Sequence, residues 1–128
     1  MALLVLAVVT FAVIGCTGAG GPIYGGTGYL GTWQMSNSSY TETVVWNPTT
    51  FSVTDTGSDV GTMICSVDSV NTGNGHIQIT TTATSGIYAG LDGVVWYILY
   101  TVSGDTMKMG MGLSGYPTTC DLGPYTRQ

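Results

Sequence analysis

From residue 29 onwards the chain alternates between apolar and polar residues in short segments, and turn residues interrupt it about every ten positions. Alternation of this kind is typical of strands with one buried and one wet face, because successive side chains of a strand point to opposite sides. An amphipathic helix would repeat its apolar residues about every 3.6 positions, and no segment of this part does so. The pattern predicts strands at 32–35, 40–46, 51–55, 62–68, 76–82, 94–102, 106–113 and 125–127.

So many short strands must hide their edges, either by closing one sheet into a barrel or by stacking two sheets. We expect an all-β fold, a small antiparallel up-and-down β-barrel of about eight strands, with a β-sandwich as the alternative. The composition agrees, because only 7% of residues are charged while 44% are apolar and 20 are glycine. The formal net charge of -5 excludes a nucleic-acid-binding surface, which needs many basic residues.

Strand parity indicates which side chains share the interior of the barrel. Tyr40 and Glu42 lie on the same face as Trp46, and three methionines alternate along 106–113. Glu42, the only glutamate, is expected either to hold the polar head of a ligand near an opening or to be a solvated carboxylate at a strand end. We predict ligand-binding residues that form an apolar interior with a polar entrance: Tyr40, Glu42, Trp46, Trp96, Tyr100, Met107 and Met109.

The alternating methionines Met107, Met109 and Met111 raise the question of a copper site, because thioethers suit monovalent copper. Methionine also fills irregular apolar space, and the chain has a single histidine. We therefore expect no metal and no cofactor. His76 alternates with Gln78 on a polar face and is interpreted as a surface residue.

The first residues differ from the rest of the chain. Residues 2–14 are apolar except for Thr10, a run too short to cross a bilayer, which takes about 20 residues, and of the length found in signal peptides. It ends in Val13-Ile14-Gly15-Cys16, which resembles the lipobox of bacterial lipoproteins. The resemblance implies a signal peptide at 1–15 and an acylated Cys16 that anchors the protein in the lipid bilayer. The expected location is the bacterial cell envelope, at the outer membrane or the cell surface, with a glycine-rich tether at 16–28 before a barrel domain at 29–128.

The remaining cysteines form an even pair if Cys16 carries lipid. We expect Cys65 and Cys120 to form a disulfide in an oxidising compartment, the alternative being two unlinked thiols.

Gly31-Thr32-Trp33 opens the first predicted strand and resembles the Gly-x-Trp opening of lipocalins. Tyr40-Thr41-Glu42-Thr43-Val44 and the hairpin at 100–107 resemble segments of short bacterial lipocalin-like lipoproteins. The resemblance covers residues 29–128 and implies a barrel whose opening tryptophan closes one end beneath a late basic residue. Arg127 is the candidate for that contact with Trp33, the alternative being a solvated terminal charge.

Two functions follow from these features. The first is a lipid-anchored module whose barrel binds a small apolar or amphipathic ligand. The second is an envelope or protein-interaction module with a packed barrel, in which the apolar outer residues Val95, Tyr97 and Leu99 meet a protein partner or a second copy. Alternatively, a loop of the chain or a membrane surface covers that outer face. No nucleophile and base stand out as a pair, so an enzyme is not expected.

Overall fold

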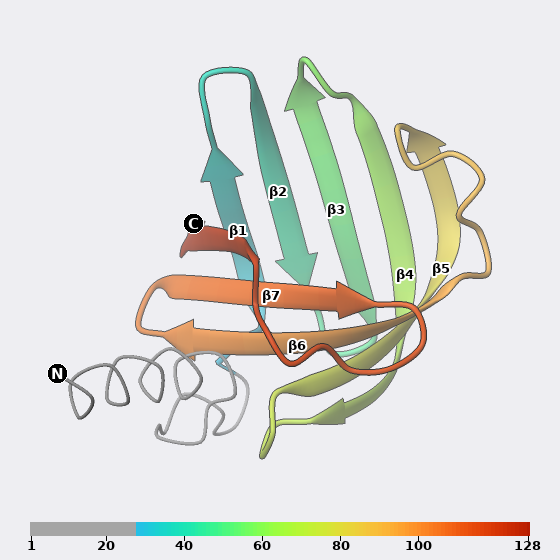
Figure 1. Ribbon diagram of the computed structural model, residues 1–128. Helices are drawn as coiled ribbons and strands as arrows, with labels where there is room; N and C mark the ends of the chain where they lie inside the picture. The colour runs from blue at the N-terminus through green and yellow to red at the C-terminus, as the bar shows by residue number, and fades with distance from the viewer. Residues whose placement is uncertain (1–27) are drawn as a thin grey trace, which may run out of the picture.

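Residues 28–128 are described by the computed structural model, and they form a closed barrel of antiparallel strands that follow one another in chain order (Figure 1). The predicted barrel is confirmed, and the sandwich is not observed. The strands are β1 Gly31–Ser36, β2 Tyr40–Trp46, β3 Thr50–Gly57, β4 Gly61–Asn71, β5 His76–Gly86, β6 Val95–Ser103, β7 Thr106–Gly112 and β8 Leu122–Arg127. Nowhere in this part of the chain is there a helix long and apolar enough to cross a membrane.

The expected leader lies outside the described residues. This holds for the signal peptide at 1–15, for Cys16, and for the tether up to residue 27.

Most predicted strands agree with the structure to within two residues at each end, but β4, β5 and β8 are longer than the alternation suggests, β8 beginning at Leu122 where 125 was expected. The β4–β5 hairpin pairs from Gly61↔Gly86 to Asn71↔His76, with two register irregularities. Parts of the added length expose side chains on both faces, so the apolar alternation is lost there.

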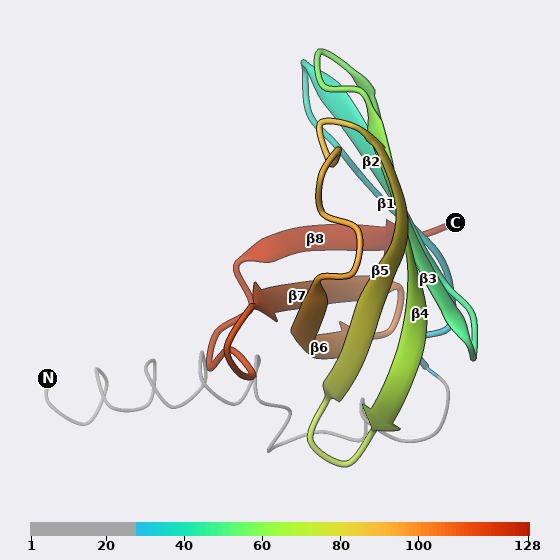
Figure 2. The same ribbon diagram turned by 90° about the vertical axis from the view of Figure 1, so that its right-hand side faces the viewer.

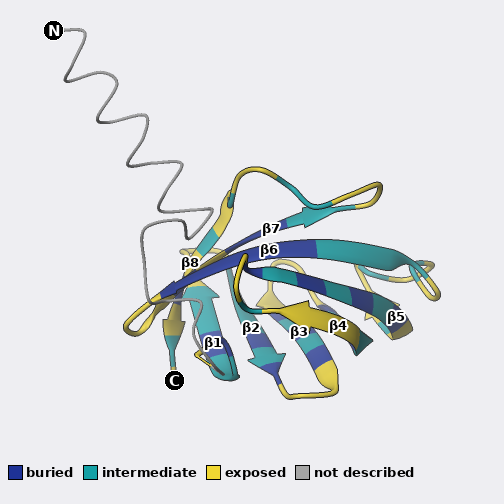
Figure 3. Cartoon of the chain, turned by 90° about the horizontal axis from the view of Figure 1, so that it is seen from below, coloured by how far each residue is buried: buried dark blue, intermediate teal, exposed yellow. Residues whose placement is uncertain are grey.

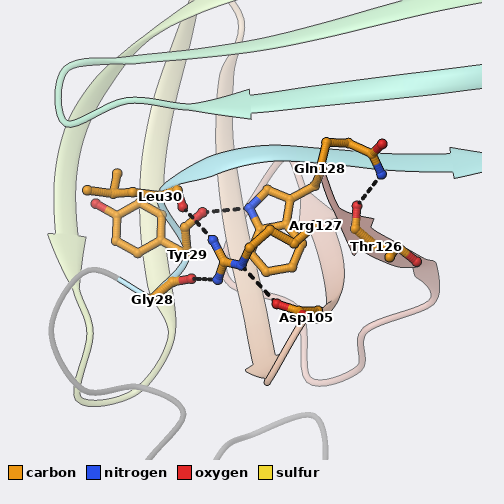
Figure 4. Close-up of polar contacts among 8 residues, drawn as sticks. Gly28, Tyr29, Leu30, Asp105, Thr126, Arg127 and Gln128 are labelled. Carbon is orange, nitrogen blue, oxygen red and sulfur yellow. Dashed lines mark hydrogen bonds and ion pairs between the residues drawn. The ribbon is translucent and has the colours of Figure 1, made fainter.

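The barrel closes where β1 meets β8, through the residue pairs Trp33↔Arg127 and Gln34↔Thr126. Arg127 lies over the Trp33 ring, with its guanidinium carbon 4.1 Å from the ring centre. The same guanidinium donates hydrogen bonds to the carbonyl oxygens of Leu30, at 3.0 Å, and Gly28, at 2.8 Å (Figure 4). The contact implied by the lipocalin resemblance is therefore confirmed, and the solvated-charge alternative for Arg127 is wrong.

Inward-facing side chains form the barrel core, as strand parity predicts, and Figure 3 shows buried bands along several strands. An aromatic cluster packs near the start of β1. In it the Trp46 ring lies 4.1 Å from the Phe51 ring, and Tyr29 contacts both Trp46 and Tyr100. The Trp33 indole donates a hydrogen bond of 2.8 Å to the Tyr29 carbonyl oxygen. This region of the interior is solidly packed.

The segment 113–121, between β7 and β8, covers part of the outer face of β6 and β7. A Cβ atom added to Gly110 would lie 2.2 Å from the Thr119 carbonyl oxygen, so only glycine permits this close approach. Tyr116 stacks on His76 with ring centres 3.9 Å apart. Leu99, predicted to belong to an apolar outer face, is paired with Gly110 and is buried. A loop of the chain itself thus covers this part of the face.

Cys65 lies on the inner side of β4 and is a free, buried thiol. It donates a 3.8 Å hydrogen bond to Thr81 Oγ1, and burial raises the pKa of the thiol. The predicted Cys65–Cys120 disulfide is therefore wrong. The reason is topological, because Cys65 faces the barrel interior whereas Cys120 belongs to the β7–β8 segment that runs over the outside. Counting cysteines says nothing about which side of a sheet each one occupies.

Candidate ligand cavity

A cavity of about 220 Å³ lies inside the barrel. Strands β2, β3, β4, β6, β7 and β8 and the loop between β5 and β6 contribute to its wall. Most of the lining is apolar, and its polar atoms come from one carboxyl group, two phenols and an indole. The lining residues are Glu42, Phe51, Val53, Met63, Tyr88, Leu91, Trp96, Met109, Met111, Leu122 and Tyr125.

The cavity opens beside the beginning of β8. Leu122 lines it and is 36% exposed, and Met111 and Leu91 are half-buried. By contrast, Phe51 and Met109 are buried and form its inner wall. The β5–β6 loop, residues 87–94, turns back from the end of β5 on its way to β6 (Figure 2). Its residues Tyr88 and Leu91 line the cavity. The entrance therefore lies between this loop and the β7–β8 segment.

Three of the residues predicted to bind a ligand line this cavity: Glu42, Trp96 and Met109. The Trp96 indole also donates a 2.9 Å hydrogen bond to Thr81 Oγ1, which fixes the ring. Trp46, Tyr100 and Met107 are buried in the core but do not line it. Tyr40 is half-buried at the start of β2 and does not line it either.

Sequence reasoning missed the polar residues that accompany Glu42, namely Asp55, Tyr88 and Tyr125. Asp55 carried a usable signal, because it continues the inward parity of Phe51 and Val53 on β3. Tyr125 lies on a predicted strand too short for parity to be informative. Tyr88 comes from a loop, and no local pattern indicates that a loop side chain will enter the barrel.

Glu42 and Asp55 lie directly opposite each other on β2 and β3. The Tyr125 hydroxyl donates a hydrogen bond to Glu42 Oε1, and the Tyr88 hydroxyl donates one to Asp55 Oδ2. Asp55 is only 2% exposed, and its other oxygen, Oδ1, is buried without a hydrogen-bond partner. Two carboxyl groups and two phenols therefore form a polar cluster, of which Glu42, Tyr88 and Tyr125 line the cavity while Asp55 lies beside Glu42 without lining it.

Burial and proximity shift the proton affinities of this cluster. Burial raises the pKa of Glu42, and the charge of Asp55 and a hydrogen bond to it raise that pKa further, while the hydrogen bond from Tyr125 opposes the shift. Burial followed by the hydrogen bonds to the carboxylates raises the pKa of both Tyr88 and Tyr125. Both phenols consequently remain protonated donors at physiological pH.

No group of three or more His, Cys, Asp or Glu side chains within residues 28–128 is arranged to hold a metal ion. Comparison of the chain with protein-family models, with curated proteins and with solved structures found no match. The candidate site therefore stands on its own geometry: a cavity of defined size, an apolar wall, and one acidic cluster.

Proposed function

We propose that this chain is a membrane-anchored bacterial lipoprotein whose lipocalin-like barrel binds a small apolar or amphipathic molecule. The observation that carries the binding role is the cavity of about 220 Å³ that opens beside Leu122. An engineered cavity of about 150 Å³ binds benzene, so this space suits a ligand of about nine non-hydrogen atoms. The leader ending in Gly15-Cys16 supports the anchor.

The chemistry of the wall favours binding over catalysis. Met63, Met109 and Met111 provide an adaptable apolar surface, which suits a ligand more than the branched side chains of a rigid core would. The lining of this cavity contains no Ser, Cys, His or Lys side chain. We therefore propose a carrier or sensor of a small molecule, not an enzyme.

The alternative function, a packed barrel that serves only protein interaction, has less support. The aromatic cluster near β1 is packed, but the cavity beside Glu42 and Met109 is not. Leu99, part of the outer face proposed for a partner or a second copy, lies beneath the chain's own 113–121 segment. Val95 and Tyr97 remain half-buried, and a role for them in contacts with another protein stays a prediction.

Blocking the cavity tests the binding role. The full chain is reconstituted in phosphatidylcholine nanodiscs, and calorimetric titration with neutral 2-phenylethanol is corrected with empty nanodiscs. We expect saturable binding that Val53→Phe abolishes, because the larger ring fills the cavity from its wall. Thr54→Phe adds the same bulk to the opposite face of β3 and is the matched control. Equal binding by the two variants, or none by the parent to any small apolar probe, would favour the packed-barrel alternative.

The anchor is tested at Cys16. In a bacterial host, Cys16→Ala should move the protein out of the membrane fraction, and mass spectrometry of the parent should find acyl groups on the Cys16 peptide. Because one sulfur cannot carry both a lipid and a disulfide, a Cys16–Cys120 disulfide in the parent would contradict acylation. Unchanged fractionation of the variant would contradict it as well.

A further inference from the structure

The polar cluster at the cavity wall contains two carboxyl groups, and no basic side chain is paired with them. The chain has two basic residues, Lys108 and Arg127. Lys108 is exposed on the outer side of β7, and the Arg127 guanidinium is engaged by Leu30, Gly28 and Asp105. Within the described part of the chain, Glu42 and Asp55 therefore face each other without a basic side chain between them.

The two phenols donate hydrogen bonds to only one oxygen of each carboxyl group. Tyr125 and Tyr88 each supply one proton to one oxygen of one carboxyl group, and Asp55 Oδ1 is left buried without a donor. A buried carboxylate oxygen without a donor has lost its water partners and gained none in the protein, which is unfavourable. Two species can supply the missing hydrogen-bond donor: a proton shared between the two carboxyl groups, or a cation that binds beside them from the cavity.

We propose that the ligand of this cavity is a small primary amine, whose ammonium group binds beside Glu42 and Asp55 while its apolar part lies against Phe51, Met63 and Met109. This inference rests on the proposed binding function. An ammonium group fits because it carries one positive charge and three N–H donors, which complement carboxylate oxygens that only accept. The cavity leaves space for about eight carbon atoms besides the nitrogen.

Other head groups fit less well. A carboxylate or phosphate would be repelled by the acidic pair, since no basic residue lines the cavity. A neutral alcohol brings a single donor and no charge. A divalent metal ion such as calcium takes six or more oxygen ligands, and no group of three acidic, His or Cys side chains is available within residues 28–128.

Three probes of nearly equal size separate these possibilities: 2-phenylethylamine, 2-phenylethanol and phenylacetate. Each is titrated into the full chain in phosphatidylcholine nanodiscs at pH 7.5, with empty nanodiscs as the blank. We expect the amine to bind at least tenfold more tightly than the alcohol, because hydrogen bonds to charged groups are the stronger class. We expect phenylacetate to bind more weakly than the alcohol.

The acidic pair must be the cause of that preference. Glu42→Gln keeps the shape and the hydrogen bond from Tyr125 but removes one charge, so it should reduce amine affinity at least tenfold and alcohol affinity by a much smaller factor. Asp55→Asn is a second variant with the same expected direction. In the unaltered protein, amine affinity should fall as the pH is lowered through the raised pKa of Glu42. The titratable groups that interact with Glu42 are Asp55 on β3, Tyr125 on β8 and Tyr88 on the β5–β6 loop. Tyr40 on β2 interacts with the two phenols.

The outcomes distinguish the two proposals. If the alcohol binds as tightly as the amine, the amine inference is overturned while the binding function stands. If none of the three probes binds, the binding function itself fails and the inference fails with it. The comparison of three probes on the unaltered protein decides between these outcomes even if a variant does not fold.

Discussion

At the scale of single residues, two methionines on one strand face different surroundings. Met107 and Met109 both point into the barrel and are buried, but only Met109 lines the cavity. A side chain beside an empty space has fewer atoms in contact with it, so removing it forfeits less dispersion energy. Alanine substitutions at these two positions therefore compare a packed site with the wall of the cavity.

We predict that Met107→Ala lowers the free energy of unfolding by about 2–5 kcal/mol, as in a packed core. Met109→Ala should cost less, about 1–2 kcal/mol, and should enlarge the space available to a ligand. Urea unfolding followed by tryptophan fluorescence measures both. Equal large losses would mean that the space beside Met109 is filled by protein.

Glu42 should make the ligand-free protein less stable at neutral pH than at mildly acidic pH. Its pKa in the fold is raised above the ordinary value of 4.5, so its contribution to stability is fully present below that value and is lost as the pH rises through the folded pKa. Glu42→Gln retains an acceptor for Tyr125 and offers Asp55 a donor, and it carries no charge to bury.

We therefore expect Glu42→Gln to be more stable than the parent at pH 8, with the difference shrinking towards pH 4. Urea unfolding of both proteins across this range gives the difference directly, and groups common to both cancel. Asp59→Asn, at an exposed turn, serves as the control and should show no such trend. A difference that stays constant with pH would contradict the raised pKa of Glu42.

At the scale of elements, the 113–121 segment makes the outer side of β6 and β7 part of the protein's interior. Two glycines on β7 permit its approach, since a Cβ at Gly110 or Gly112 would lie within 2.5 Å of a segment carbonyl oxygen: 2.2 Å from Thr119 and 2.4 Å from Gly115. Tyr116 adds contacts to His76 and Tyr97. Burial beneath this segment also lowers the pKa of His76.

We predict that Gly110→Ala forces the segment away from β7 and lowers the free energy of unfolding by about 1–3 kcal/mol. Gly115→Ala is the matched control, because a Cβ there meets no atom within 4 Å, and it should change stability by less than about 0.5 kcal/mol. Increased hydrogen exchange at the segment and at Leu99 would accompany the first change only. Equal behaviour of the two variants would show that the segment does not depend on the glycine.

At the scale of the whole molecule, closure of the barrel depends on a short strand at the end of the chain. The register of β8 on β1 comprises two residue pairs, one of which includes Arg127. The guanidinium adds its contact with Trp33 and its hydrogen bonds to Leu30 and Gly28. A single side chain thus joins the two ends of the described chain.

We predict that Arg127→Ala lowers the free energy of unfolding by about 2 kcal/mol, through loss of a cation–π contact and of charged hydrogen bonds. The ion pair with Asp105 contributes little to this, because Asp105 is 80% exposed, so Asp105→Asn should cost less than about 0.5 kcal/mol. Thermal unfolding of the two variants at equal salt concentration compares them. A loss in Asp105→Asn as large as in Arg127→Ala would assign the effect to the ion pair instead.

The amino-acid sequence by itself determined the fold class, the approximate strands and the face on which most core residues lie. It did so because apolar and polar residues alternate with the period of a strand, and because turn residues separate the strands. Glu42, Trp96 and Met109 were accordingly placed in the interior and found at the cavity. The pairing of Trp33 with Arg127 followed from a resemblance at Gly31-Thr32-Trp33 and not from alternation.

Only the tertiary structure decided which interior residues share the cavity. Strand parity reports the face of a side chain but not its level along the barrel axis, so Trp46, Tyr100 and Met107 were assigned to the same space as Met109 and lie elsewhere in the core. Strand register brings Asp55 opposite Glu42, and a loop supplies Tyr88. The tertiary structure likewise decided that the Cys65 thiol is free and that Leu99 is buried. Each of these depends on contacts between residues distant in the chain, and local patterns carry no information about such contacts.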